Sequence, residues 1–101
     1  MLSKGSLALA FCLLTSCITA TAPLEEYTLA DVAIKAARTV QAVRYSPGNW
    51  NQAEENFRQA RILYNEREYE EARQLFIKAK LSAERAENSA RLIRQQNGDV
   101  L

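Results

Sequence analysis

The chain has 101 residues, the size of one small domain, and 48% of them are hydrophobic while 25% are charged. This balance is typical of a globular protein rather than a disordered one. Thirteen Lys and Arg stand against twelve Asp and Glu with no block of either sign, which gives little support to a nucleic-acid-binding tail. The sequence contains no His, which excludes His-dependent triads and imidazole metal sites.

Residues 1–16 have the organisation of an export signal. Lys4 is followed by an apolar run from Leu7 to Leu14 and then by small polar residues. The run is far shorter than the roughly 20 residues that a permanent membrane-spanning helix needs. We therefore expect a signal peptide that is removed, and not a lasting anchor.

Leu14-Thr15-Ser16-Cys17 resembles the bacterial lipobox, in which a Leu stands three places before a cysteine. In that family the cysteine thiol receives a diacylglyceryl group and the chain is cut just before it. The resemblance implies lipidation of Cys17 and a lipidated tether over residues 17–24. The alternative is ordinary cleavage after Ala20-Thr21-Ala22. Ile18 occupies the place where Asp favours the inner membrane, so the expected location is the outer membrane, facing the periplasm.

Residues 25–101 are predicted to be all-α, because Gly and Pro are rare and Ala-rich charged stretches lie between them. The first helix is expected over residues 25–45. Its apolar positions step by four and three residues, which predicts one buried face made of Leu29, Ala33, Ala36, Val40 and Val43. Ser46-Pro47-Gly48-Asn49 then ends the pattern.

The second helix is expected over residues 50–65, with Asn49 as its N-cap. Its buried stripe is predicted to be Ala53, Phe57, Ala60 and Tyr64. No Gly or Pro follows, but the apolar stripe loses phase between Tyr64 and Tyr69. We expect a tight hairpin near residues 65–67, and a continuous helix is the alternative.

The third helix is expected over residues 68–96, with one apolar seam at heptad spacing. Five of its eight positions are Ala, which allows close helix packing; the seam is Tyr69, Ala72, Phe76, Ala79, Ala83, Ala86, Ala90 and Ile93. The spacing of Ala and Phe is similar in helices two and three, and resembles that of a single tetratricopeptide repeat. The predicted fold is a small three-helix bundle with such an antiparallel hairpin and a long C-terminal helix.

Three short motifs resemble a family of short bacterial lipoproteins of unknown function. They are Tyr45-Ser46-Pro47, Tyr69-Glu70-Glu71-Ala72 and the Ala seam. The Gly-Asp pair that commonly precedes the second motif in that family is Arg67-Glu68 here. Because such domains often accompany peptidoglycan-binding domains similar to outer-membrane protein A, the resemblance implies a role in the cell envelope. It implies no activity.

The helix lengths predict a candidate interface. If residue 50 lies opposite residue 83, the end of the third helix overhangs the hairpin and leaves part of its seam uncovered. The interface would comprise Ala83, Ala86, Ala90 and Ile93, and a solvated helix end is the alternative. Tyr45 and Trp50 flank the first turn and are further interface candidates, with packing across that turn as the alternative.

Other charged groups fit a solvated surface better than a site. Glu66, Glu68, Glu70 and Glu71 lack the spacing of a calcium loop. Acids interrupt the basic strip of Arg58, Arg61, Arg73, Lys78 and Lys80.

No nucleophile with a matching base is evident, so we expect no catalysis, no cofactor, no metal, no nucleic acid and no small-molecule substrate. The predicted function is a lipid-anchored structural or interaction protein of the cell envelope that contacts a protein partner or itself. The alternative is an adaptor, similar to a tetratricopeptide-repeat or pilotin protein, that docks a peptide or helix of an envelope complex.

Overall fold

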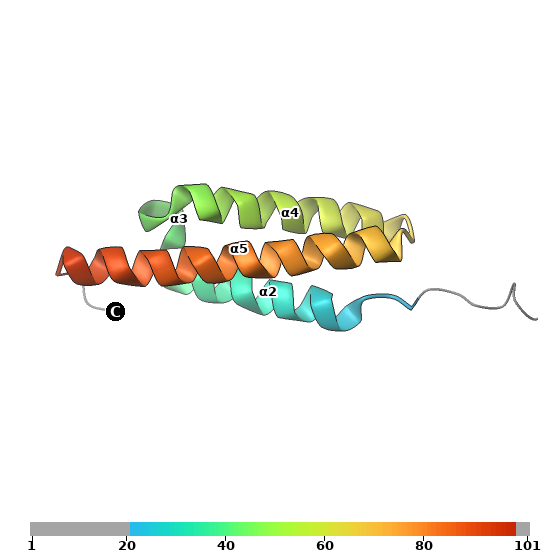
Figure 1. Cartoon of the computed structure of the whole chain (residues 1–101), viewed down its shortest axis with the longest axis horizontal. Helices are drawn as coiled ribbons and strands as arrows, with labels where there is room; N and C mark the ends of the chain where they lie inside the picture. Colours follow the sequence, from blue (N-terminus) through green and yellow to red (C-terminus); the bar gives the residue numbers. More distant parts are fainter. Residues whose placement is uncertain (1–20, 99–101) are drawn as a thin grey trace, which may run out of the picture.

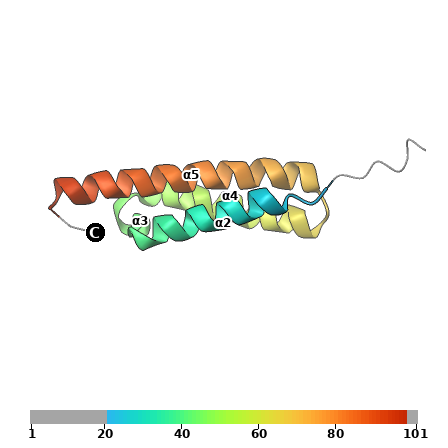
Figure 2. The ribbon, with the colours of Figure 1, turned by 90° about the horizontal axis from the view of Figure 1, so that it is seen from below.

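The computed structural model describes residues 21–98, which form a bundle of four helices (Figure 1). They are α2 (Leu24–Thr39), α3 (Ala42–Tyr45), α4 (Pro47–Asn65) and α5 (Tyr69–Gln96). α2 and α5 run in the same direction and α4 runs antiparallel to both, as the two views in Figures 1 and 2 show. The predicted all-α bundle with an antiparallel hairpin and a long C-terminal helix is confirmed.

α5 is the helix on which the others pack. α2 and α4 both lie along it, and they contact each other only slightly. The inner face of α5 is fully buried and consists of Ala72, Phe76, Ala79, Ala83, Ala86 and Ala90. The heptad stripe predicted for this helix is therefore confirmed, with Tyr69 and Ile93 half-buried at its two ends. Alanine allows the two neighbouring helices to approach the α5 backbone closely.

Aromatic side chains join α2 to the hairpin at one end of the bundle. The Tyr27 ring of α2 lies 4.6 Å from the Phe76 ring, centroid to centroid. It also makes edge contacts with Phe57 at 5.6 Å and with Tyr64 at 5.4 Å. Offset and edge geometries of this kind are the favourable ones for aromatic pairs, so one α2 side chain contacts both arms of the hairpin.

The prediction of one continuous first helix was wrong, because the chain turns at Gln41. Gln41 adopts a left-handed conformation with φ of 62°, and the four-residue helix α3 begins after it. The Gln41 amide donates to the Arg38 carbonyl at 3.0 Å, and the Arg94 guanidinium donates to the Val40 carbonyl at 3.2 Å. The turn carries Ala42 into the core, where it is fully buried. Tertiary packing therefore decides this break, since the local sequence has no Gly or Pro here.

The buried face predicted for the first helix was also partly wrong. Ala33 and Val40 are buried, but Leu29 and Val43 are 43% and 53% exposed. The face that meets the core instead comprises Ala30, Ala33, Ile34 and Ala37. The apolar residues of α2 cover more than one face, and the predicted stripe followed the wrong one.

α4 begins earlier than predicted. Pro47, not Trp50, is its first residue, because the fixed φ of proline suits the first position of a helix. Asn49 is therefore inside the helix and is not the N-cap. Its Nδ2 donates to Ser46 Oγ at 3.2 Å.

The predicted hairpin between α4 and α5 is confirmed, and it has the hydrogen bonds of a Schellman motif. The Arg67 amide donates to the Tyr64 carbonyl at 3.1 Å, and the Glu68 amide donates to the Leu63 carbonyl at 2.9 Å. Arg67 occupies the left-handed position with φ of 64°. At the end of α5 the corresponding position belongs to Gly98, with φ of 76°, which adopts this conformation without a Cβ clash.

We predict that Arg67→Gly stabilises the protein by about 1 kcal/mol, because it removes the left-handed penalty of a residue with a Cβ. For a domain of this size, the thermal midpoint should rise by about 4 to 8 °C. Arg67→Ala is the matched control, since it removes the same side chain but keeps the Cβ. An equal gain from both variants would show that the arginine side chain, and not the backbone, is unfavourable.

Candidate functional site

The interface predicted from the sequence lies mostly in the core. Ala83, Ala86 and Ala90 are 0% exposed and Trp50 is 8% exposed, while Tyr45 and Ile93 are half-buried. The expected overhang assumed that the first helix also ends at the first turn and leaves the end of α5 without cover. Because α2 runs parallel to α5 and α3 follows it, residues of both helices cover the seam, and the uncovered-seam prediction was wrong.

Tyr45 and Trp50 pack across the first turn and are covered by arginines. The Arg38 guanidinium lies 5.6 Å from the Trp50 ring. The guanidinium groups of Arg44 and Arg94 lie 5.2 Å and 5.5 Å from the Tyr45 ring. These cation–π contacts close the end of the bundle, so packing, the alternative given above, describes both aromatic residues.

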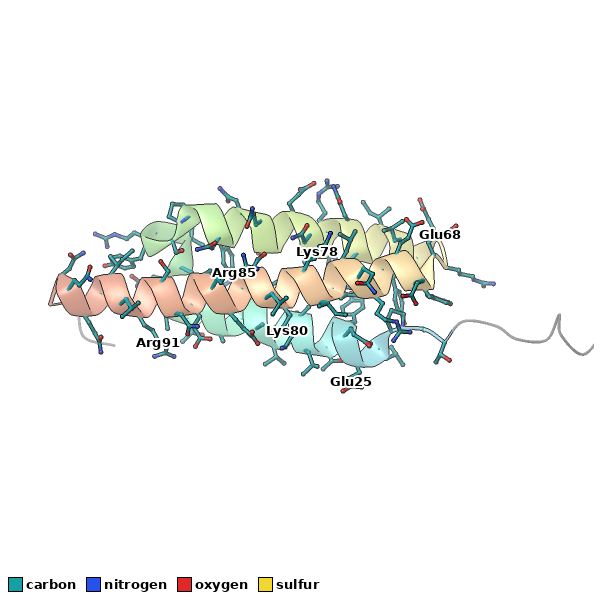
Figure 3. All side chains as sticks on the ribbon, in the orientation of Figure 1. Glu25, Glu68, Lys78, Lys80, Arg85 and Arg91 are labelled. Atoms are coloured by element: carbon teal, nitrogen blue, oxygen red, sulfur yellow. The ribbon has the colours of Figure 1, made fainter. Side chains whose placement is uncertain are left out.

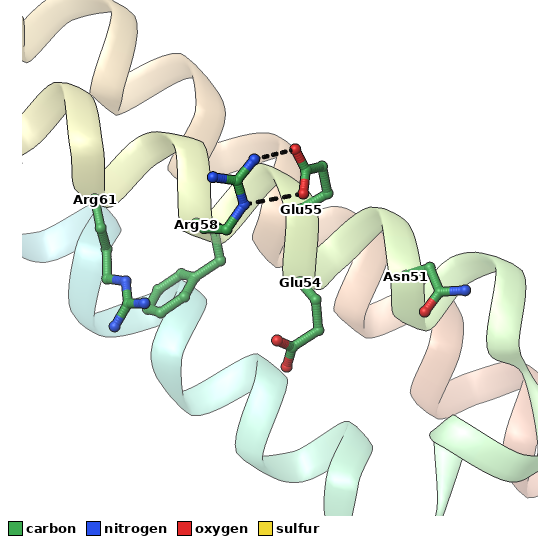
Figure 4. A pocket seen from close by; sticks show the side chains of 6 residues that line it. Asn51, Glu54, Glu55, Arg58 and Arg61 are labelled. Carbon is green, nitrogen blue, oxygen red and sulfur yellow. Dashed lines mark hydrogen bonds and ion pairs between the residues drawn. The ribbon is translucent and has the colours of Figure 1, made fainter.

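An open depression of about 430 Å³ lies along α4, beside α2, as Figure 4 shows. It is lined by Asn51, Glu54, Glu55, Phe57, Arg58 and Arg61. Its charges already have partners within the chain. Arg58 donates to both Glu55 oxygens at 2.6 Å and 3.1 Å, and Glu54 lies 3.7 Å from an Arg38 nitrogen. The Arg61 guanidinium lies 5.3 Å from the Phe57 ring.

The ionisation of the Glu55–Arg58 pair in this depression does not suit proton transfer. The hydrogen bonds from Arg58 hold the pKa of the Glu55 carboxyl below its ordinary value, and the same pair raises the pKa of Arg58. Both groups are therefore charged at neutral pH. A general base or acid needs a pKa near the working pH, which neither of these groups has.

The basic side chains that the sequence analysis assigned to a solvated surface form separate ion pairs. Arg73 contacts Glu26 at 2.9 Å and Lys80 contacts Glu84 at 3.1 Å, while Lys78 and Lys80 project from different sides of α5 (Figure 3). Within residues 21–98, no group of three or more Cys, Asp or Glu side chains is placed to hold a metal ion. In the same range, no helix is both long and apolar enough to cross a membrane.

α2 and α5 expose aliphatic side chains that the sequence analysis did not assign to an interface. Leu29 and Val32 of α2 are 43% and 57% exposed, and Ile77 and Leu81 of α5 are 37% and 43% exposed. We call these four residues the aliphatic face. The Glu26 carboxylate accepts a hydrogen bond from Arg73, 47 positions later, so Leu29 and Val32 are level with Phe76 and Ala79 of the neighbouring helix. Glu25 of α2 and Lys80 of α5 project from the same side of the bundle in Figure 3. Leu29 and Val32 follow Glu25 at helical spacing, and Ile77 and Leu81 flank Lys80, so the four aliphatic side chains lie at similar heights on that side.

Sequence reasoning missed the aliphatic face, although part of its signal was present. Leu29 was assigned to the buried stripe, and the outward positions Val32, Ile77 and Leu81 were not considered. On α5, Ile77 and Leu81 stand one turn apart and outside the Ala seam. A search for a second apolar stripe on each amphipathic helix would have found them.

Comparison with protein-family models identifies the family of this chain. A model described as a domain of unknown function, DUF4398, matches residues 25–98. The chain belongs to this family. The match covers all of the hairpin and nearly all of α2, so the family is defined by the bundle itself. Searches of curated proteins and of solved structures gave no match.

We predict that Ala86→Leu destabilises the bundle by about 1 to 3 kcal/mol, because Ala86 is fully buried and the added atoms would overpack the core. Urea unfolding followed by circular dichroism measures the change. Asn88→Leu is the control, since it adds a leucine to the same helix at an exposed position. Equal stability of the Ala86→Leu variant and the unaltered protein would mean that the seam is open in solution.

Proposed function

We propose that the chain is a lipid-anchored structural or interaction protein of the cell envelope, acting through helix contacts and without catalysis. The bundle serves to present one face to another protein beside a membrane. The observation that carries this proposal is the aliphatic face, which offers four apolar side chains on two adjacent helices. Large apolar side chains gathered on one side of a protein are typical of an interaction site.

Only the sequence supports the anchor, because the signal peptide, Cys17 and the first half of the tether lie outside the described residues. The lipobox supports it. Six residues separate Cys17 from Leu24, the first residue of α2. At no more than 3.3 to 3.6 Å per residue, this tether keeps the bundle within about 25 Å of the lipid surface. An outer-membrane location facing the periplasm follows from the same resemblance and is part of the proposal.

A second candidate function is an adaptor that docks an amphipathic helix from another envelope protein. The side-by-side arrangement of α2 and α5 favours it, because exposed aliphatic residues on two parallel helices can receive a third helix. Both candidate functions use the aliphatic face, and they differ in which molecule binds there.

We predict that Cys17→Ser abolishes lipid attachment in a bacterial host with a lipoprotein pathway. The serine hydroxyl is a far weaker nucleophile than the thiolate. Metabolic labelling with a palmitate analogue should give a labelled band in the membrane fraction for the unaltered protein and no label for the variant.

Cys12→Ser is the matched control, because Cys12 lies inside the apolar run that is discarded with the signal. It should keep full labelling. Labelling that survives Cys17→Ser, or an unaltered protein that carries no label, would overturn the proposed anchor.

A further inference from the structure

Charge is distributed unevenly along the bundle. The end where α2 begins and the hairpin turns, residues 21–28 and 64–73, carries six Glu and two Arg, which gives a net charge of −4. The opposite end, residues 38–46 and 85–98, carries five Arg and one Glu, which gives +4. Glu25 and Glu68 mark the first end in Figure 3, and Arg91 lies toward the second.

The helix dipoles reinforce this arrangement. α2 and α5 run in the same direction, so both amino termini lie at the acidic end and both carboxyl termini lie at the basic end. Each end therefore carries the side-chain charge that stabilises the termini of α2 and α5, whereas α4 runs the other way and has no acidic residue in its first turn and no basic residue in its last. Two bundles placed side by side in the same direction would set like charges against each other. In opposite directions, each acidic end meets a basic end.

The aliphatic face lies midway between charges of opposite sign. Because Arg73 contacts Glu26, Glu25 is level with Ala72 of α5. At 1.5 Å per residue, Leu81 lies about 14 Å along α5 from the level of Glu25 and about 15 Å from Arg91. Glu25, Lys80 and Arg91 all project from the α2 side of the bundle in Figure 3.

We propose that two copies of this chain pair in opposite directions through the aliphatic face, around a twofold axis near Leu81. The inference deepens the proposed function by naming its partner as a second copy, and it rests on that function. The rotation places Glu25 of each copy opposite Arg91 of the other, whose guanidinium also contacts Glu87 of its own chain at 2.9 Å. It also brings the Lys80–Glu84 pair of each copy, 3.1 Å apart, close to the same pair of the other at the centre of the interface.

The size of the face explains why the charges are needed. Four aliphatic side chains cover less than the roughly 800 Å² per partner of a stable interface. Polar contacts along α2 and α5 must supply the remaining interface area. The opposite charges of the two ends of the bundle align the two copies so that these contacts form. Each twofold contact occurs twice, so one substitution alters two contacts.

Disulfide trapping in the native membrane tests the pairing directly. After removal of the signal, Cys17 is the only cysteine, and lipid occupies its thiol in the proposed anchor. Leu81→Cys lies near the twofold axis and should give a covalent dimer. Ile62→Cys, equally exposed but on α4, is the matched control and should give none.

The direction of pairing is tested by Glu25→Cys and Arg91→Cys. Co-expressed with different tags, they should cross-link to each other, and neither should cross-link to itself. A Glu25→Cys self-adduct would show parallel pairing. A Leu81→Cys adduct with a different protein would show a foreign occupant. A Leu81→Cys protein that stays monomeric would also overturn the proposal, whereas palmitate labelling would continue to report the anchor independently.

Exchanging the charges at positions 25 and 91 tests whether the two ends of the paired bundles attract each other. The protein is extracted with mild detergent for this experiment. Glu25→Arg should weaken dimerisation roughly tenfold, and so should Arg91→Glu, because each sets like charges opposite each other at two places. The double variant Glu25→Arg/Arg91→Glu should restore the dimer in light-scattering measurements. The predicted contact between Glu25 and Arg91 would be contradicted if the unaltered protein, both single variants and the double variant all dimerised equally. It would also be contradicted if the double variant kept its thermal midpoint but did not recover dimerisation.

Discussion

The structure depends on alanine at the inner face of α5. Five of the fully buried positions on this helix are Ala, and only Phe76 among its fully buried residues is large. Small side chains let α2 and α4 lie close to the same helix, which is why all three long helices form one bundle although α2 and α4 contact each other little. A larger residue on this seam would separate at least one of them. Close packing here replaces the wide hydrophobic core of larger domains.

Because the core of α5 is mostly alanine, larger side chains at the two ends of the bundle supply much of its apolar contact. Alanine buries little area, so the bundle needs additional apolar contacts, and the aromatic group around Tyr27 and Phe76 supplies them at one end. The other end uses Trp50 and Tyr45 with arginines stacked on their rings. The aliphatic side chains of Leu29 and Leu81 take no part in either cluster. They are exposed on the surface instead.

The sequence predicted those elements whose pattern has only one interpretation. The seam of α5 repeats at heptad spacing over the whole helix, and its buried positions were identified correctly. The hairpin was predicted from a loss of phase. The overhang was wrong because helix lengths alone do not tell how far along α5 the chain after α2 reaches, and Val40 and Ala42 cluster with Ala86 and Ala90. The turn at Gln41 has no local signal, since its cause is the burial of Ala42 and the hydrogen bond from Arg94 to Val40, contacts between distant parts of the chain. The aliphatic face was missed because α2 is apolar on two sides and only one stripe was assigned.

Arg73 determines how the chain enters the bundle. Its guanidinium binds the Glu26 carboxylate at 2.9 Å and the Thr21 carbonyl at 3.3 Å, so the segment just before α2 is held against the beginning of α5. Of the ion pairs within residues 21–98, Arg73 and Glu26 form the least exposed, which makes it less sensitive to screening by salt than the others. In the proposed anchor, the acidic end is consequently the one closest to the lipid. Two copies that pair in opposite directions then hold their tethers at opposite ends of the dimer, so both can reach one membrane only if the dimer lies along its surface.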